Sequence, residues 1–202
     1  MKKNVFVLFS AIAMLIVFNS CNSEPKWQTF FNGKDLTGWT ARGKATWTAK
    51  DGILKGEGDF GHIYADPVLT DLEVKGKFRI SSTGKNANSG LYFRANPPSD
   101  NPDGFPRGYE AQICNTQDAF TGWLWKPGKP TGAATENLTK DGEWFDYRIK
   151  AVGSHIEFWI NDQPVMTYDD DEYKQGQFAI QMHNPGMVIE AKDLYYRDLS
   201  KK

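Results

Sequence analysis

The sequence alternates between apolar and charged residues at positions 72–80, which read Leu72-Glu73-Val74-Lys75-Gly76-Lys77-Phe78-Arg79-Ile80. Successive side chains of a β-strand point to opposite faces of a sheet, so this period of two predicts a half-buried strand. Its charged residues would lie on a solvated face. Such a strand needs neighbours to cover its apolar face, and an antiparallel sheet with one wet face is the usual arrangement.

Turn signals on both sides of this segment supply the neighbours. Asp51-Gly52 and Gly153-Ser154 each separate two apolar-rich segments and predict two-residue hairpins. No sustained helical periodicity follows residue 27. Further short strands are expected at Gly90–Ala95, Tyr109–Ile113, Pro164–Tyr168, Phe178–Met182 and Val188–Arg197. The pattern predicts an all-β fold, an antiparallel β-sandwich or jelly roll with about ten to twelve strands.

The first 26 residues predict export to the cell envelope of a bacterium. Lys2 and Lys3 precede an apolar run, Val5–Phe18, and Cys21 follows it closely. This order is typical of a secretory signal, and the cysteine indicates a lipoprotein signal. We expect residues 1–20 to be the signal peptide, lipidated Cys21 to begin a tether over 21–26, and one domain to span 27–202. The membrane would be a partner through the lipid, in the periplasm or at the outer membrane. An uncleaved anchor helix is the alternative, but the run is shorter than the roughly 20 residues of a membrane span.

Charge and cysteine content argue against a nucleic-acid-binding protein and against a domain held together by disulfides. The chain has 24 basic and 25 acidic residues and no basic cluster, so no nucleic-acid partner is expected. If Cys21 is acylated, Cys114 is the only thiol left, and no internal disulfide forms. We expect Cys114 to be a packed small residue.

Alternation also brings polar side chains together. In three predicted strands, the residues that point away from the core include Tyr92 and Arg94, then Glu110 and Gln112, then Gln181 and His183. If the strands are neighbours, these side chains form one patch that suits a polyhydroxylated ligand. An ordinary solvated sheet face is the alternative.

Three features lie outside the regular strand pattern. The long loop Asn115–Glu143 holds Trp123 and Trp125, and at least one of them is expected to line a ligand groove. His62 follows the glycine-rich stretch Gly56–Gly61 and is interpreted as a turn residue, with a place at the edge of a site as the alternative. The run Asp169–Glu172 lacks the alternation of a calcium loop and is interpreted as a solvated acidic turn.

Six short motifs occur in the order found in the family of 3-keto-disaccharide hydrolases, which this chain resembles over about residues 27 to 200. They are Phe31–Trp39, Asn88–Arg94, Gly108–Ile113, Gly142–Trp144, Ile160–Asp162 and Gly176–His183. The resemblance implies a concanavalin A-like sandwich that acts on an oligosaccharide or glycoside. Within these motifs and the long loop, the expected substrate-binding residues are Arg94, Gln112, Gln181, Tyr92, Asn88, Trp123 and Trp125.

Chemistry on a 3-keto sugar needs one base and one group that stabilises an enolate. Glu110 or His183 would be the base, and Arg94 or a divalent metal would stabilise the enolate. The sequence requires no cofactor. Two alternatives remain open: a non-catalytic, lectin-like glycan-binding lipoprotein, and a conventional glycosidase with paired carboxylates.

Overall fold

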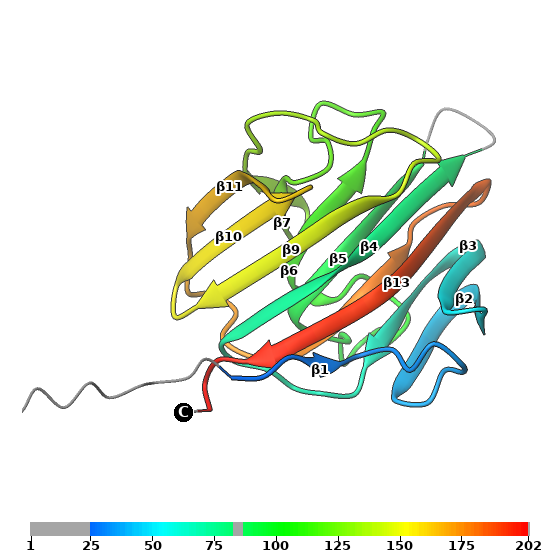
Figure 1. Cartoon of the computed structure of the whole chain (residues 1–202), viewed down its shortest axis with the longest axis horizontal. Helices are drawn as coiled ribbons and strands as arrows, with labels where there is room; N and C mark the ends of the chain where they lie inside the picture. Colours follow the sequence, from blue (N-terminus) through cyan, green and yellow to red (C-terminus); the bar gives the residue numbers. More distant parts are fainter. Residues whose placement is uncertain (1–24, 83–86, 202) are drawn as a thin grey trace, which may run out of the picture.

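The alternating segment forms β4, Leu72–Ser82, in the computed structural model, which describes residues 25–82 and 87–201 (Figure 1). Every other assigned element of these residues is also a strand. They are β1 Gln28–Thr29, β2 Trp39–Lys50, β3 Ile53–Ala65, β5 Asn88–Asn96, β6 Arg107–Cys114, β7 Leu124–Lys126, β8 Lys129–Gly132, β9 Phe145–Val152, β10 His155–Ile160, β11 Gln163–Asp169, β12 Gln177–Met182 and β13 Met187–Asp198. The predicted signal peptide and Cys21 lie outside the described residues. Within the described part of the chain, there is no apolar helix of the length that crossing a membrane requires.

One strand joins the two layers of the fold. The first half of β3 pairs with β13 through Leu54–Glu57, and its second half pairs with β12 through Gly61–Tyr64. A back sheet therefore runs β11-β10-β9-β4-β13, and a front sheet runs β12-β5-β6-β7-β8. This is the antiparallel β-sandwich predicted from the sequence.

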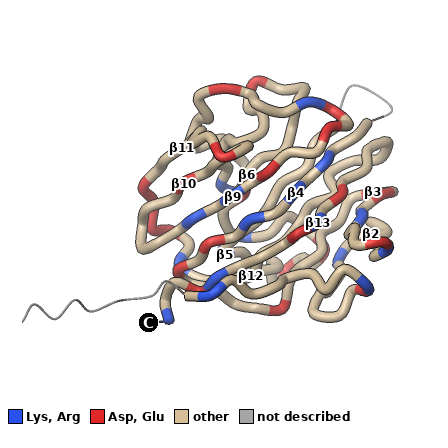
Figure 2. The backbone as a smooth tube through the Cα atoms, viewed as in Figure 1, with Lys and Arg blue, Asp and Glu red and all other residues tan. Residues whose placement is uncertain are grey.

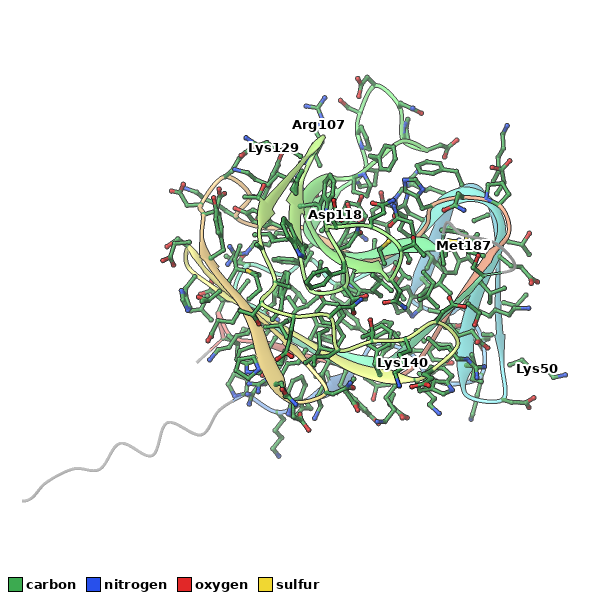
Figure 3. The ribbon with its side chains drawn as sticks, turned by 90° about the horizontal axis from the view of Figure 1, so that it is seen from above. Lys50, Arg107, Asp118, Lys129, Lys140 and Met187 are labelled. Carbon is green, nitrogen blue, oxygen red and sulfur yellow. The ribbon has the colours of Figure 1, made fainter. Side chains whose placement is uncertain are left out.

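The core lies between the sheets. Leu72, Val74, Phe78 and Ile80 of β4 are buried in one large apolar cluster, as the period of two predicts. Phe93 of the front sheet packs edge-on against Phe158 of the back sheet, with ring centroids 5.8 Å apart. Seen from above, side chains fill the space between the two layers (Figure 3). The front sheet is thus supported from behind, which leaves its other face to carry the site.

The outer face of the back sheet is less solvated than predicted. Lys, Arg, Asp and Glu are interspersed along β4, β9 and β13 (Figure 2). Glu73 is fully buried between Arg148 and Arg197, which both bond its carboxylate. Trp27, Trp144 and Trp159 each lie beneath one or two cationic side chains. Ion pairs and cation–π contacts therefore cover most of this face.

Both predicted two-residue hairpins are present, at Asp51-Gly52 and at Gly153-Ser154, whereas one predicted loop differs. Asp51 and Gly52 both have positive φ, 51° and 80°, as a type I′ hairpin between β2 and β3 requires. The region 115–143, predicted to be a loop, contains the hairpin β7–β8, which turns at Pro127-Gly128 and pairs with β6. This hairpin extends the front sheet beside the site.

Candidate functional site

Strand register places the polar residues of the front sheet in two transverse rows. One row runs from Tyr64 through Ala179, Tyr92 and Glu110 to Trp125, each residue opposite the next on adjacent strands. In the second row, His62 is opposite Gln181, and Gly90 is opposite Gln112. Residues directly opposite each other in antiparallel strands share a face. Both rows therefore project from the outer face of the front sheet.

A cavity of about 520 Å³ lies over these rows. Its floor is polar, and two walls rise beside it: the loop that leads into β6 and the hairpin β7–β8. The lining residues are Asn88, Tyr92, Phe105, Pro106, Gly108, Glu110, Gln112, Gln117, Trp125, Lys126, Pro127, Gly128, Gln181 and His183. The fold thus forms a concave pocket whose floor can form hydrogen bonds and whose sides are largely apolar.

Glu110 is the only carboxylate among the described lining residues. Its Oε2 accepts a 2.8 Å hydrogen bond from the Tyr92 hydroxyl, and part of the side chain remains accessible. Burial raises the pKa of Glu110 to about 7, and the bond from Tyr92 opposes that rise. A carboxylate with this pKa is matched to accepting a proton near neutral pH.

His183 lies in the same pocket as Glu110, as the alternation predicts. It is half-buried, and burial lowers its pKa. Its Nδ1 has no protein partner among the described residues. The imidazole is therefore neutral at neutral pH, with one nitrogen left for a ligand.

His62 lies within β3 and is fully buried, so its interpretation as a turn residue is wrong. Burial, and secondarily the nearby His183, lower the pKa of His62 to about 3. Its ring packs edge-on against Phe60 and Tyr92, and its Nε2 is 3.4 Å from Nε2 of Gln181. The alternation of Phe60, His62 and Tyr64 was the signal in the sequence that could have shown this.

The prediction that Arg94 shares the pocket is wrong. The β5–β6 register shifts between Phe93 and Asn96, and Arg94 adopts a φ of 47°. Such an irregularity redirects a side chain away from its alternating position. Arg94 is instead 1% exposed and donates to the carbonyl oxygens of Thr70 and Gly153 at 2.7 and 2.8 Å. It also pairs with Asp71 at 3.3 Å, so it links loops at one end of the sandwich.

The two loop tryptophans lie in different places. Trp125 lines the pocket, which meets the expectation for at least one of them. Trp123 does not line it and packs on the core, edge-on to Phe120 at 6.2 Å. The prediction for Trp123 is therefore wrong, whereas Asn88, Tyr92, Gln112 and Gln181 lie where they were expected.

Phe105 and Lys126 are among the lining residues that were not predicted. Phe105 is 52% exposed, and its ring contacts those of Phe60 and His183. Lys126 binds Asp170 and Glu172, both at 2.7 Å. The acidic turn expected to be solvated thus holds Lys126 at the pocket rim. Phe105 lies in an irregular segment and Lys126 ends a strand of three residues, so neither belongs to a periodic pattern by which the sequence could identify it.

No metal site is evident in the part of the chain that the structure describes, where no three His, Cys, Asp or Glu side chains gather closely enough to hold an ion. Four residues that line the pocket instead carry buried polar atoms without a protein partner among the described residues: Oδ1 of Asn88, Nε1 of Trp125, Oε1 of Gln181 and Nδ1 of His183. Such a set can donate to and accept from hydroxyl groups, as a sugar requires.

Comparisons with known proteins agree with this fold. The sequence pattern of the family described as 3-keto-alpha-glucoside-1,2-lyase-like domain matches residues 26–200. A "putative glycosyl hydrolase" from Parabacteroides distasonis is similar in structure, with a TM-score of 0.69 and 20% identity over 86% of this chain and 94% of its own. The carbohydrate-binding module CBM66 from Bacillus subtilis has a TM-score of 0.66 and 17% identity over 83% and 98%. The carbohydrate recognition domain of Emp46p has a TM-score of 0.63 and 10% identity over 86% and 98%. No curated protein sequence matches the chain.

Proposed function

We propose that this chain, which belongs to the family of 3-keto-alpha-glucoside-1,2-lyase-like domains, cleaves the glycosidic bond of 3-keto-glycosides by removing the proton at C2 with Glu110. One observation carries the proposal. Glu110 is the single carboxylate among the described lining residues, and burial raises its pKa to about 7. A lone base suits elimination, whereas ordinary glycosidases use a pair of carboxylates.

The elimination follows from the ketone. The carbonyl at C3 acidifies the C2 proton, which passes to the Glu110 carboxylate. The electron pair of the C2–H bond forms the C1=C2 double bond as the C1–O bond breaks. That bond's electrons leave with the glycosidic oxygen, which takes the proton from Glu110 and so returns Glu110 to its carboxylate form. Addition of water across C1 and C2 of the resulting enone completes a net hydrolysis.

Neutral donors replace Arg94 as the stabilisers of the developing charge. The Gln112 amide and the Trp125 indole N–H line the pocket beside Glu110 and are the groups proposed to bind the C3 oxygen. His183 presents a nitrogen without a protein partner and is proposed to hydrogen-bond the departing oxygen. Each such group typically contributes about 10²–10⁴-fold to the rate.

Incubation of the purified protein with a 3-keto-disaccharide and with its unoxidised parent tests the proposal. Cleavage of the oxidised sugar alone, abolished by Glu110→Gln, is the expected result. Equal cleavage of both sugars would contradict it, because a mechanism without the ketone would then operate.

A second candidate is non-catalytic glycan binding. Exposed Phe105, half-buried Trp125 and the neutral amides form a pocket that can hold a sugar without reacting, and CBM66 shows that such a fold serves in a carbohydrate-binding module. Tight binding of both oxidised and unoxidised sugars, with no product from either, would favour this candidate. Fold alone does not decide between them.

Anchoring at the cell envelope is a separate part of the proposal, supported by the apolar run that ends at Cys21. Several acyl chains would anchor the protein stably. Cys21→Ser is expected to release the protein from membranes or stop its maturation. A Cys21→Ser protein that remains processed and membrane-bound would contradict lipid anchoring.

A further inference from the structure

The Tyr92 hydroxyl has two polar neighbours and a single proton. Its oxygen lies 2.8 Å from Oε2 of Glu110 and 3.1 Å from Nε2 of Gln181. An ionised carboxylate only accepts hydrogen bonds, so the tyrosine proton points to Glu110. The lone pairs of the hydroxyl oxygen then accept from the Gln181 amide. The direction of both bonds follows from this count.

The same assignment of hydrogen-bond donors and acceptors gives the tautomer of His62. Nε2 of Gln181 also lies 3.4 Å from Nε2 of His62, and an amide nitrogen is only a donor. The histidine nitrogen therefore accepts, which places the imidazole proton on Nδ1, a buried atom without a protein partner among the described residues. His62 is fully buried, and its lowered pKa keeps it neutral. Gln181 thus donates to both His62 and Tyr92, and Tyr92 donates to Glu110.

We propose that His62, Gln181 and Tyr92 are positioning residues that hold Glu110 as a carboxylate and leave its Oε1 as the proton acceptor. Oε2 is occupied by Tyr92, whereas Oε1 lies against Gly90, where no side chain intervenes. If Oε2 of Glu110 carried the proton and donated to Tyr92, the tyrosine proton would face the Gln181 nitrogen, which cannot accept it. The hydrogen-bonded residues therefore keep the proton off Oε2. The bond from Tyr92 is also stronger to a charged carboxylate than to a neutral carboxyl group, so it opposes the effect of burial.

Other groups near Glu110 do not supply this effect. Tyr147 approaches from the core side, and His183 and Lys126 line the same pocket. His183 is neutral, and Lys126 is already bonded to Asp170 and Glu172. One part of this proposal rests on the proposed function, namely that the proton accepted by Oε1 comes from C2 of the sugar. The hydrogen-bond chain itself does not.

Carbon-13 NMR of the full chain, labelled at glutamate side-chain carboxyls, tests the chain without substrate. The Glu110 resonance is identified by its loss in Glu110→Gln. Tyr92→Phe is expected to raise the pKa of Glu110 by about 1 to 2, because a hydrogen bond to a charged group is lost. Tyr64→Phe is the matched control. It removes a buried hydroxyl that has no protein partner, two strands away in the same row, and should leave the Glu110 pKa unchanged.

Two further measurements keep the proposal testable if Tyr92→Phe does not fold. Nitrogen-15 NMR of the unsubstituted chain should show His62 neutral, with its proton on Nδ1, at pH 7. Gln181→Leu should also raise the Glu110 pKa, by less than Tyr92→Phe. A proton on Nε2 of His62, or equal effects of Tyr92→Phe and Tyr64→Phe, would overturn the proposal. A correct titration in a protein that turns over no 3-keto-glycoside would instead overturn only the proposed activity.

Discussion

Glu110 and Gly90 lie so close across β5 and β6 that a Cβ at position 90 would be 2.1 Å from Oε1 of Glu110 and 2.6 Å from its Cγ. Real Cβ atoms do not approach other atoms so closely, so any side chain at position 90 must displace the carboxylate. Glycine at this position is thus a requirement of the site, because it leaves room for the base.

Gly90→Ala should therefore abolish most turnover with little loss of secondary structure. We expect a fall of about 10² or more in kcat/KM, the usual contribution of a positioned base. The double substitution Gly90→Ala with Glu110→Gln should be no slower than Glu110→Gln alone, because both changes remove the same function. Additive losses in steady-state kinetics would show that Gly90 acts independently of Glu110.

The raised pKa of Glu110 predicts a specific pH dependence of stability. Between about pH 4.5 and pH 7 the unfolded chain releases this proton while the folded chain retains it, so this group lowers the free energy of unfolding as pH rises. Glu110→Gln removes this titrating group. The change that it causes in the free energy of unfolding should therefore be more favourable at pH 8 than at pH 4, by up to about 3 kcal/mol. Urea unfolding at the two pH values measures it. A difference that is absent or reversed would contradict the burial argument.

The same group should shape the rate profile. If Glu110 is the base, kcat/KM should rise with pH and reach half its plateau near pH 7. His62, with a pKa of about 3, should contribute no step in this range. A profile that is flat between pH 5 and 8 would exclude Glu110 as the base.

The two loop tryptophans provide a matched pair for binding. Trp125→Ala should weaken affinity for the sugar about tenfold or more, since a stacked aromatic ring contributes about 1 kcal/mol beyond its buried area. Trp123→Ala should lower the melting temperature and leave affinity nearly unchanged, because Trp123 packs on the core. Calorimetric titration and thermal melts of both variants separate the two effects. Loss of affinity in Trp123→Ala alone would contradict the placement of both residues.

Arg94 should act on stability and leave the chemistry intact. Arg94→Met removes the guanidinium that pairs with Asp71 and donates to the carbonyl oxygens of Thr70, Gly153 and Tyr173, and is expected to cost about 3–5 kcal/mol. Arg79→Met is the control, because it breaks a more exposed pair with Glu190 worth about 0–1 kcal/mol. Denaturant titration gives both values. An Arg94→Met protein with normal stability and no turnover would contradict this and show that Arg94 acts in the reaction.

Regular alternation is what made the site predictable. Tyr92, Glu110, Gln112, Gln181 and His183 reach the pocket because each follows an unbroken period of two. Neighbouring strands then bring the rows together. Chain order alone does not give the pairing, since β12 inserts between β3 and β5.

The wrong predictions fall where the local backbone geometry departs from the period of two. Arg94 sits at a register shift with positive φ, which no single residue type announces. The glycines before His62 looked like a turn, yet they make room within β3. A Cβ at Gly56 would lie 2.5 Å from the Trp47 ring, and one at Gly61 would lie 2.6 Å from the Arg42 carbonyl oxygen. The hairpin that carries Trp125 is too short and too polar to show a strand pattern.

The most direct test of the account follows a deuterium label at C2 of a 3-keto-glycoside during cleavage in ordinary water. We expect the label to be lost from C2 as the glycosidic bond breaks, and Glu110→Gln to stop both events together. An unreacted sample of the labelled sugar, kept without protein, corrects for spontaneous exchange beside the ketone. Bond cleavage with the label fully retained at C2 would contradict proton abstraction by Glu110.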